Sequence, residues 1–202
     1  MFHTWLGATD STGATVRTAL LDFWKAFDLV DHHVLIAKLY SLGVKPTGVR
    51  QGTRIGPWLF VVMINDLQLL SDESFHIWKF ADDTTVSEII PPSCPSSLQQ
   101  VVNEISSWSY ENHLQFNSSK CKELRTCFKR SPPSCAPVIS DGLEFEKVSN
   151  AKILGVTIRQ DLKWDDHIDN ITAKAAKRLY LLRELRDLEL VAMTLCYFIV
   201  AQ

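Results

Sequence analysis

The sequence predicts an α+β fold, in which helices cover a small antiparallel sheet. Short apolar runs that alternate as strands do are interspersed with segments whose apolar residues recur at helical spacing. In chain order they read strand, two helices, hairpin, helix, strand and helix, a mixture typical of the α+β class. The 202 residues are 46% hydrophobic and 22% charged. This balance is that of a globular protein, and the length allows one ordinary domain.

The first half of the chain is expected to supply one strand, two helices and a hairpin. The hairpin is tight, because only the tripeptide 81–83 separates its two alternating runs. The first helix has a capping aspartate and a terminating glycine, and a proline opens the second helix. The expected elements are the strand Val16–Phe23, the helix from Asp31 to Gly43, the helix from Pro57 to Leu70, and the hairpin strands Phe75–Phe80 and Thr84–Ile89.

The second half is expected to contain a helix, a strand and a long final helix. Ser97 and Gln100 form a capping box that begins the first of these helices. A strand is expected over Lys152–Ile158, and the long helix over Ile171–Leu190. The Pro-, Ser- and Cys-rich stretch 131–137 is the best candidate for a boundary, which divides the chain into 1–130 and 131–202.

Several functional classes are excluded by simple features of the chain. The longest apolar runs, such as Leu59–Ile64, are too short to cross a bilayer. The segment Met1–Asp10 has neither the basic region nor the apolar core of a secretory signal. The five cysteines are odd in number and form no C-x-x-C pair. We therefore expect reduced thiols without a disulfide partner, an intracellular location in nucleus or cytoplasm, and no membrane contact.

The net charge of −2 conceals an uneven distribution along the chain. Residues 60–119 carry a single basic residue, Lys79, against eight acids, and both flanking segments are mildly basic. Two interpretations are open: the pattern is ordinary surface charge, or it marks a cation-binding centre flanked by surfaces that tolerate phosphate.

Three carboxylates are candidates for chemistry: Asp22 near a strand end, and Asp82 with Asp83 at the hairpin tip. The second Asp-Asp pair, Asp165-Asp166, lies in a polar stretch before a helix and is an internal control. If Asp22 packs beside the hairpin, the clustered carboxylates must protonate, separate or bind a cation. An all-oxygen site suits Mg²⁺. Otherwise the three are unrelated surface acids.

Five segments in order resemble the reverse transcriptases of non-LTR (LINE-type) retrotransposons. Together they span about residues 14 to 186, which makes the resemblance specific although each motif alone is weak. The matching segments are Leu21-Asp-Phe-Trp-Lys-Ala-Phe-Asp28 continuing to His32, Gly48-Val-Arg-Gln-Gly-Thr-Arg-Ile-Gly-Pro57 continuing to Leu67, Phe80-Ala-Asp-Asp83, Trp108 through Asn112 with Leu114, Asn117, Lys120 and Cys121, and Ile153-Leu-Gly-Val-Thr-Ile158 with Leu162-Lys-Trp164 and His167-Ile168. The resemblance implies a polymerase palm with fingers and thumb largely missing.

The resemblance also implies a metal site. Asp22, Asp82 and Asp83 would hold two Mg²⁺ ions, helped by the carbonyl of Phe23. Two such ions are the usual device for in-line nucleotidyl transfer from a dNTP to a primer 3′-hydroxyl. The implied activity is that of an RNA-directed DNA polymerase, with an RNA template and a DNA primer as partners.

Four further residues receive roles from the resemblance alone. Phe27 would lie under the sugar of the incoming nucleotide and exclude a 2′-hydroxyl. Gln51 and Gly52 would line the nucleotide and template pocket. Lys120 would protonate the leaving pyrophosphate or neutralise its charge.

The chain also departs from the family's pattern. Only a few residues after Gly43 separate the first helix from the second motif, where the family has several tens, so the sequence predicts an internal deletion or a gene-model error. Little chain is available for fingers or thumb. The alternative function is an inactive retrotransposon remnant with at most weak nucleic-acid binding. Removal of the fingers would expose apolar surface, with Trp5, Trp24 and Trp58 as candidates, and would favour self-association.

Overall fold

The computed structural model describes residues 1–11, 13–26, 30–44, 56–69, 74–92, 94–129 and 134–187. Contacts divide the chain into two compact units: 1–151 with 160–162, and 152–159 with 163–202. The strands that follow the expected boundary at residue 131, up to residue 148, belong to the first unit. The expected deletion after Gly43 and the roles of Phe27, Gln51 and Gly52 concern positions 45–55 and 27–29, outside the described residues.

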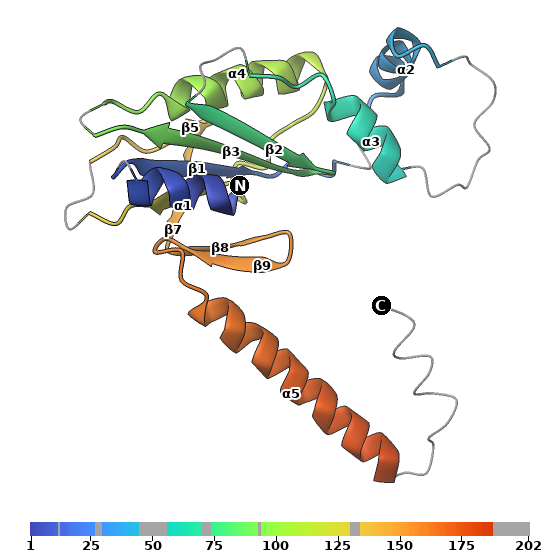
Figure 1. The fold of residues 1–202 in the computed structure, drawn as a ribbon. Helices are drawn as coiled ribbons and strands as arrows, with labels where there is room; N and C mark the ends of the chain where they lie inside the picture. The colour runs from blue at the N-terminus through green and yellow to red at the C-terminus, as the bar shows by residue number, and fades with distance from the viewer. Residues whose placement is uncertain are drawn as a thin grey trace. The chain divides into compact units, whose positions relative to one another are not determined.

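The first unit is built around a five-stranded sheet in the order β2-β3-β1-β4-β7 (Figure 1). All neighbouring strands are antiparallel except β4 and β7, which are parallel. The mixture of this sheet with packed helices confirms the predicted α+β class. The strands are β1 (Thr15–Leu21), β2 (Phe75–Phe80), β3 (Asp83–Ile90), β4 (Lys122–Thr126) and β7 (Glu146–Val148).

Helices lie on both faces of this sheet (Figure 1). On one face, α4 (Leu98–Glu111) buries Leu98, Val101, Val102 and Ile105, four residues at helical spacing, in a core shared with strand residues such as Ala19 and Val86. The fully buried Phe60 and Met63 of α3 (Gly56–Ile64) join the same core. We call this the α4 face.

The opposite face, the α1 face, is covered by a helix that the sequence analysis did not identify, α1 (Phe2–Ser11). Trp5 is fully buried there, and its indole Nε1 donates a hydrogen bond of 2.9 Å to Ser87 Oγ on β3. The prediction that Trp5 lies on an uncovered patch is therefore wrong. Trp24 and Trp58 do lie on the surface, with 48% and 74% of their area exposed.

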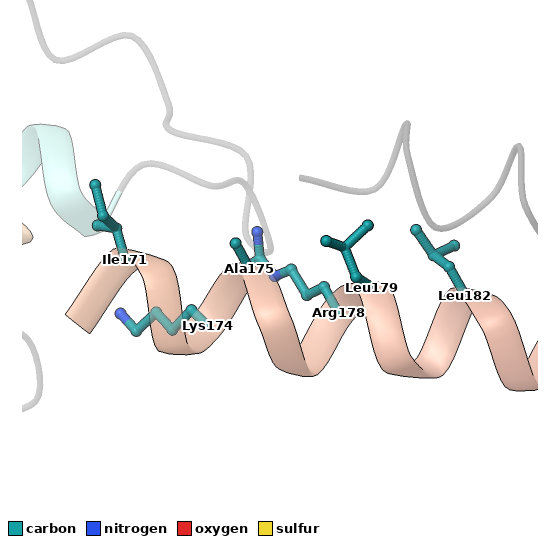
Figure 2. A pocket seen from close by; sticks show the side chains of 6 residues that line it. All are labelled: Ile171, Lys174, Ala175, Arg178, Leu179 and Leu182. Carbon is teal, nitrogen blue, oxygen red and sulfur yellow. The ribbon is translucent and has the colours of Figure 1, made fainter. Parts of the chain in front are cut away.

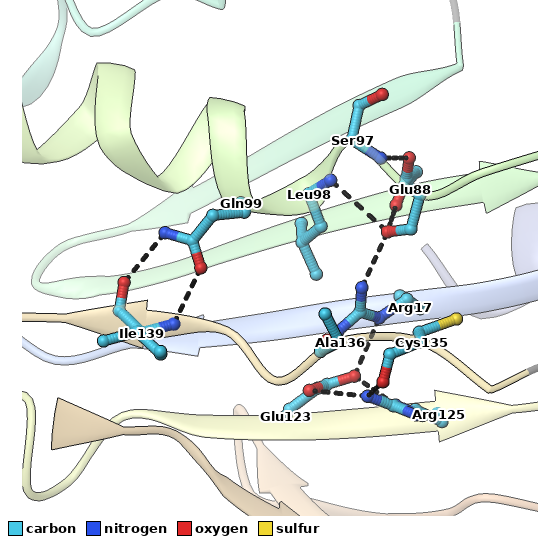
Figure 3. A network of polar contacts seen from close by, with 11 residues as sticks. Arg17, Glu88, Ser97, Leu98, Gln99, Glu123, Arg125, Cys135, Ala136 and Ile139 are labelled. Carbon is cyan, nitrogen blue, oxygen red and sulfur yellow. Dashed lines mark hydrogen bonds and ion pairs between the residues drawn. The ribbon is translucent and has the colours of Figure 1, made fainter.

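A buried ionic network, drawn in Figure 3, crosses the sheet on the α4 face. Arg17 is 3% exposed, and its Nε donates to Glu123 Oε1 at 2.8 Å, while Arg125 bonds the same carboxylate. Glu88 accepts hydrogen bonds from Ser96 Oγ and from the backbone N–H of Ser97. Each of these buried charged groups has hydrogen-bond partners within the network, which offsets the free-energy cost of burying it.

The beginning of α4 differs from the predicted capping box. Ser97 makes no side-chain cap hydrogen bond, and its own N–H donates to Glu88 Oε1 at 2.6 Å. A carboxylate near the positive end of a helix is electrostatically favourable. The cap therefore comes from β3, a partner distant in sequence.

The other helix caps follow the sequence more closely. Asp31 caps α2 (His32–Ser41) by accepting from the N–H groups of His33 and Val34, as expected. Gly43 follows the helix with a φ of +79°, a conformation that favours glycine. Helix α3 ends at Ile64, six residues before the predicted end.

The predicted strand at 152–158 is instead a hairpin of β8 (Asn150–Ile153) and β9 (Val156–Arg159). The two residues between the strands, Leu154 and Gly155, both have positive φ, which reverses the chain. A second short hairpin joins β5 (Ile139–Ser140) to β6 (Leu143–Glu144) through Asp141 and Gly142.

The long helix of the second unit, α5 (Asp165–Asp187), begins six residues before the predicted start. The control pair Asp165-Asp166 lies in its first turn. Figure 2 shows Ile171, Ala175, Leu179 and Leu182 along one side of α5, where they line a shallow hollow together with Lys174 and Arg178. Both Ile171 and Leu179 are about half exposed. No described helix is both long enough and apolar enough to cross a membrane.

Candidate active site

The predicted hairpin brings Asp82 and Asp83 to one end of the sheet. Phe80 pairs directly with Asp83, so the turn consists of only Ala81 and Asp82. Ala81 has a φ of +50°, the left-handed conformation that such a tight reversal requires. Asp82 thus lies on a two-residue turn, and Asp83 is the first residue of the strand that follows it.

Asp22 lies across from this turn on the neighbouring strand. In the antiparallel register of β1 and β3, Leu21 pairs with Thr84, the last pair of the ladder. One step further along both strands come Asp22 and Asp83. Directly paired residues share a face of the sheet. Two residues that are 61 positions apart in the sequence thus lie at the ends of neighbouring strands, close enough for their charges to interact.

The charges of the three acids interact. The carboxyl group of Asp83 is partly desolvated, which raises its pKa, and repulsion from Asp82 and from Asp22 raises that pKa further. The pKa shift has the direction expected for like charges that lie close together. A bound cation would reverse this penalty, because it favours the ionised carboxylates.

The described structure does not arrange the three acids as a closed cage. Among the residues described, no group of three or more His, Cys, Asp or Glu side chains is positioned to hold one metal ion. What the structure shows is Asp22 and Asp83 directly beyond the last pair of the β1–β3 ladder, with Asp22 and Asp82 both close enough to repel the charge of Asp83. The oxygen donors fit a hard divalent cation in chemical type. Reverse transcriptases as a family use such a metal.

The backbone around Asp22 is fixed by the segment that carries Lys120. The carbonyl of Asp22 accepts a hydrogen bond of 2.8 Å from the N–H of Asn117, and its N–H points to Cys121 Sγ at 3.5 Å. Residues 118–120 form a turn between these two contacts. Lys120 is thus exposed on a turn beside Asp22, near the acids but without a described bond to them.

Two residues near Asp22 were not predicted as part of the site. Cys121 is buried, and its pKa is raised to about 11, first by desolvation and then by the charges of Asp22 and Asp141, against the lowering effect of a backbone contact with Asp22. Its thiol therefore stays protonated at neutral pH and is a poor nucleophile. Asp141 also accepts a hydrogen bond from Ser118 Oγ at 3.1 Å. The Asp-Gly pair at the β5–β6 turn was the available signal.

Aromatic side chains surround the acidic end in two different ways. Phe23 is buried and stacks on Phe116 with ring centroids 5.2 Å apart, so its ring belongs to the core. Phe80 shares a face with Asp83 and is 65% exposed. Trp24 is 48% exposed two residues after Asp22. The acidic end of the sheet therefore has exposed aromatic rings at nearby positions of the chain.

Comparison with known proteins identifies the family. The sequence matches the family described as "Reverse transcriptase (RNA-dependent DNA polymerase)" over residues 7–158. It is 29% identical over 143 residues to the RNA-directed DNA polymerase from mobile element jockey of Drosophila melanogaster, covering 65% of this chain and 15% of that protein. It is 25% identical over 208 residues to the probable RNA-directed DNA polymerase from transposon BS of the same fly, covering 83% of this chain and 22% of that protein.

A third relative is the probable RNA-directed DNA polymerase from transposon X-element of Drosophila melanogaster, 29% identical over 156 residues, with 71% of this chain and 16% of the relative covered. The chain thus spans less than a quarter of these relatives. Among solved structures, apo telomerase from Candida tropicalis, truncated from its C-terminal domain, has a similar fold. Its TM-score is 0.53 at 12% identity, over 80% of this chain and 37% of the telomerase.

The mobile-element relatives and the telomerase likeness confirm the predicted LINE-type, palm-like domain. Since the match to the family covers residues 7–158, which include Asp22, Asp82, Asp83 and Lys120, the chain belongs to the reverse transcriptase family.

Proposed function

We propose that this chain is a fragment of a polymerase domain that copies RNA into DNA. The observation that carries the proposal is the placement of Asp22 and Asp83 at the ends of the adjacent strands β1 and β3, next to Asp82 on the turn. The raised pKa of Asp83 supports it, because a cluster of repelling carboxylates gains most from a bound cation.

In this reaction the primer 3′-oxygen attacks the α-phosphorus of a dNTP. The bond from that phosphorus to the bridging oxygen breaks, and pyrophosphate leaves. Asp22, Asp82 and Asp83 would hold two Mg²⁺ ions, with the Phe23 carbonyl as a further oxygen donor. When bound, the ions supply charge stabilisation at phosphorus. Binding of the ions would require the Asp82 carboxylate to move closer to those of Asp22 and Asp83, because the described side chains do not form a group of three that could hold a metal ion.

The remaining roles complete the proposal. Lys120, exposed beside Asp22, would donate a proton to the leaving pyrophosphate or neutralise its charge. Phe27 would select deoxynucleotides by contact with the sugar. Gln51 and Gly52 would line the nucleotide pocket. RNA template, DNA primer and dNTP are the proposed partners.

Primer extension on an RNA template tests the proposal. Extension that requires Mg²⁺, stops with a chelator and is lost in Asp83→Asn would support it, because an amide cannot neutralise the metal. Asp165→Asn is the matched control, an aspartate of the other Asp-Asp pair, and is expected to change little. Equal loss in both variants would show that the assay reports folding and would count against the assigned site.

A second candidate is a remnant that binds nucleic acid weakly without catalysis. It is favoured by the lack of a three-carboxylate group positioned for one metal among the described residues, and by the short connection after Gly43. Background extension by the unmodified chain, together with retention of a labelled RNA–DNA duplex at low salt, would establish it. Charge contacts of that kind weaken steeply as salt rises.

We also propose that exposed apolar surface makes this chain self-associate. The apolar side of α5 and the exposed Trp58 supply such surface. Leu179→Gln should reduce the sedimentation coefficient at high protein concentration. A concentration-independent monomer in the unmodified chain would contradict the proposal.

A further inference from the structure

The carboxyl end of α3 is bound by two lysines that come from different elements. The last carbonyls of a helix have no partner within the helix. Lys38 on α2 donates to the carbonyl of Met63 at 2.7 Å and to Asp66 Oδ1 at 2.7 Å. Lys79 on β2 donates to the carbonyls of Ile64, Asn65 and Leu67 at 3.0, 3.1 and 2.9 Å. Positive charge at this end of a helix is also favourable.

The contacts of Lys79 use its whole capacity to donate. An ammonium group has three N–H donors and no acceptor. Each of the three carbonyls accounts for one of them. The side chain is partly buried in this position. All three N–H donors of Lys79 are therefore used at the end of α3. None remains to bind a substrate phosphate, although Lys79 lies only three residues before Asp82.

The place of Lys79 in the hairpin connects this cap to the acids. Lys79 pairs with Thr84, which pairs with the core residue Leu21, so its side chain lies on the α4 face. The next pair, Phe80 with Asp83, lies on the opposite face. The end of β2 is thus bound to the end of α3 on one face of the sheet, while Asp83 lies on the opposite face.

We infer that Lys79 is a positioning residue, which fixes the acidic turn of Asp82 and Asp83 against the end of α3. The inference rests on the proposed function for the role of these acids.

The test compares Lys79→Met with Lys38→Met in the full chain. Both variants remove an ammonium from the same helix end, but only Lys79 lies on the hairpin. Mn²⁺ affinity, measured by electron paramagnetic resonance, should fall about 10-fold in Lys79→Met, as for partners that orient metal ligands. It should change less than about twofold in Lys38→Met, since loss of a cap alone does not move the acids. Lys79→Arg, which keeps a charged donor, should restore part of the affinity.

Hydrogen exchange provides a readout that does not depend on metal. The amides of residues 80–84 should exchange faster in Lys79→Met and unchanged in Lys38→Met. Equal exchange of this turn in both variants, or no change in Lys79→Met, would overturn the inference. If the unmodified chain and Asp83→Asn bind Mn²⁺ alike, the proposed function fails, and hydrogen exchange alone then decides whether Lys79 positions the turn.

Discussion

Replacement of Glu123 by alanine should destabilise the first unit strongly. The Glu123 side chain is fully buried, and Arg17, which is 3% exposed, donates to it at 2.8 Å. The variant removes the carboxylate bound to the buried Arg17 guanidinium, whose remaining hydrogen bonds among the described residues go to Ser96 Oγ and the carbonyl of Ala136. Loss of one member of a buried ion pair costs about 3–5 kcal/mol. We expect about 3 kcal/mol, because these two partners partly compensate the charge.

Urea unfolding at pH 7, followed by circular dichroism, measures this loss. Glu146→Ala is the matched control, since Glu146 forms an exposed ion pair with Lys122 at 3.5 Å, and such pairs contribute less than about 1 kcal/mol. The double variant Arg17→Met with Glu123→Leu should recover much of the stability, because it removes both charges of the buried Arg17–Glu123 pair and leaves neither without its partner. If Glu123→Ala costs no more than Glu146→Ala, the buried network does not have the energetic role described for it.

Three further predictions concern stability. Burial raises the pKa of Glu123, but bonds from Arg125 and Arg17 outweigh burial and leave it below its usual value. This contribution is therefore present above the unfolded-state pKa of about 4.5 and lost as the pH falls through the folded-state value, so the urea midpoint should fall more steeply below pH 4.5 in the unmodified chain than in Glu123→Gln. Trp5→Phe removes a buried donor to Ser87 and should cost about 1–2 kcal/mol in thermal unfolding; an unchanged melt would contradict the packing of α1. Leu98→Ala should cost about 3 kcal/mol, because Leu98 is fully buried, and comparable stability in urea would refute its place in the core.

Local signals were sufficient for those elements whose caps and turns lie within a few residues. Asp31 and Gly43 mark α2, and the hairpin around Asp82 could be read from its alternation and short turn. The structure differs from the prediction where a residue distant in sequence, or a single tight turn, determines the local conformation. Glu88 on β3 replaces the capping box of Ser97. The left-handed pair Leu154-Gly155 breaks the predicted strand in two, although its glycine was a signal that could have been used.

Helix α1 could not be predicted for a related reason. Its residues carry no acidic first turn and no basic last turn, and its apolar pattern is weak. What fixes it is tertiary contact, above all the burial of Trp5 against Ser87 and Trp78. Helices in proteins derive most of their stability from such packing rather than from intrinsic propensity. A tryptophan that looked like exposed surface in the sequence is therefore part of the core.

The acidic end shows how pairing and packing act on one strand. The antiparallel register brings Asp22 and Asp83 to the same end of the sheet, because each follows directly on the last pair of the ladder, Leu21 with Thr84. Register does not set the angle of the turn beyond the last pair, and like charges there repel. That angle needs a contact from outside the ladder. The carbonyls of Ile64, Asn65 and Leu67, at and just beyond the end of α3, provide it by binding Lys79 two residues before the turn, on the face away from Asp83. The same alternation of side chains that exposes the acid on one face thus anchors its strand on the other.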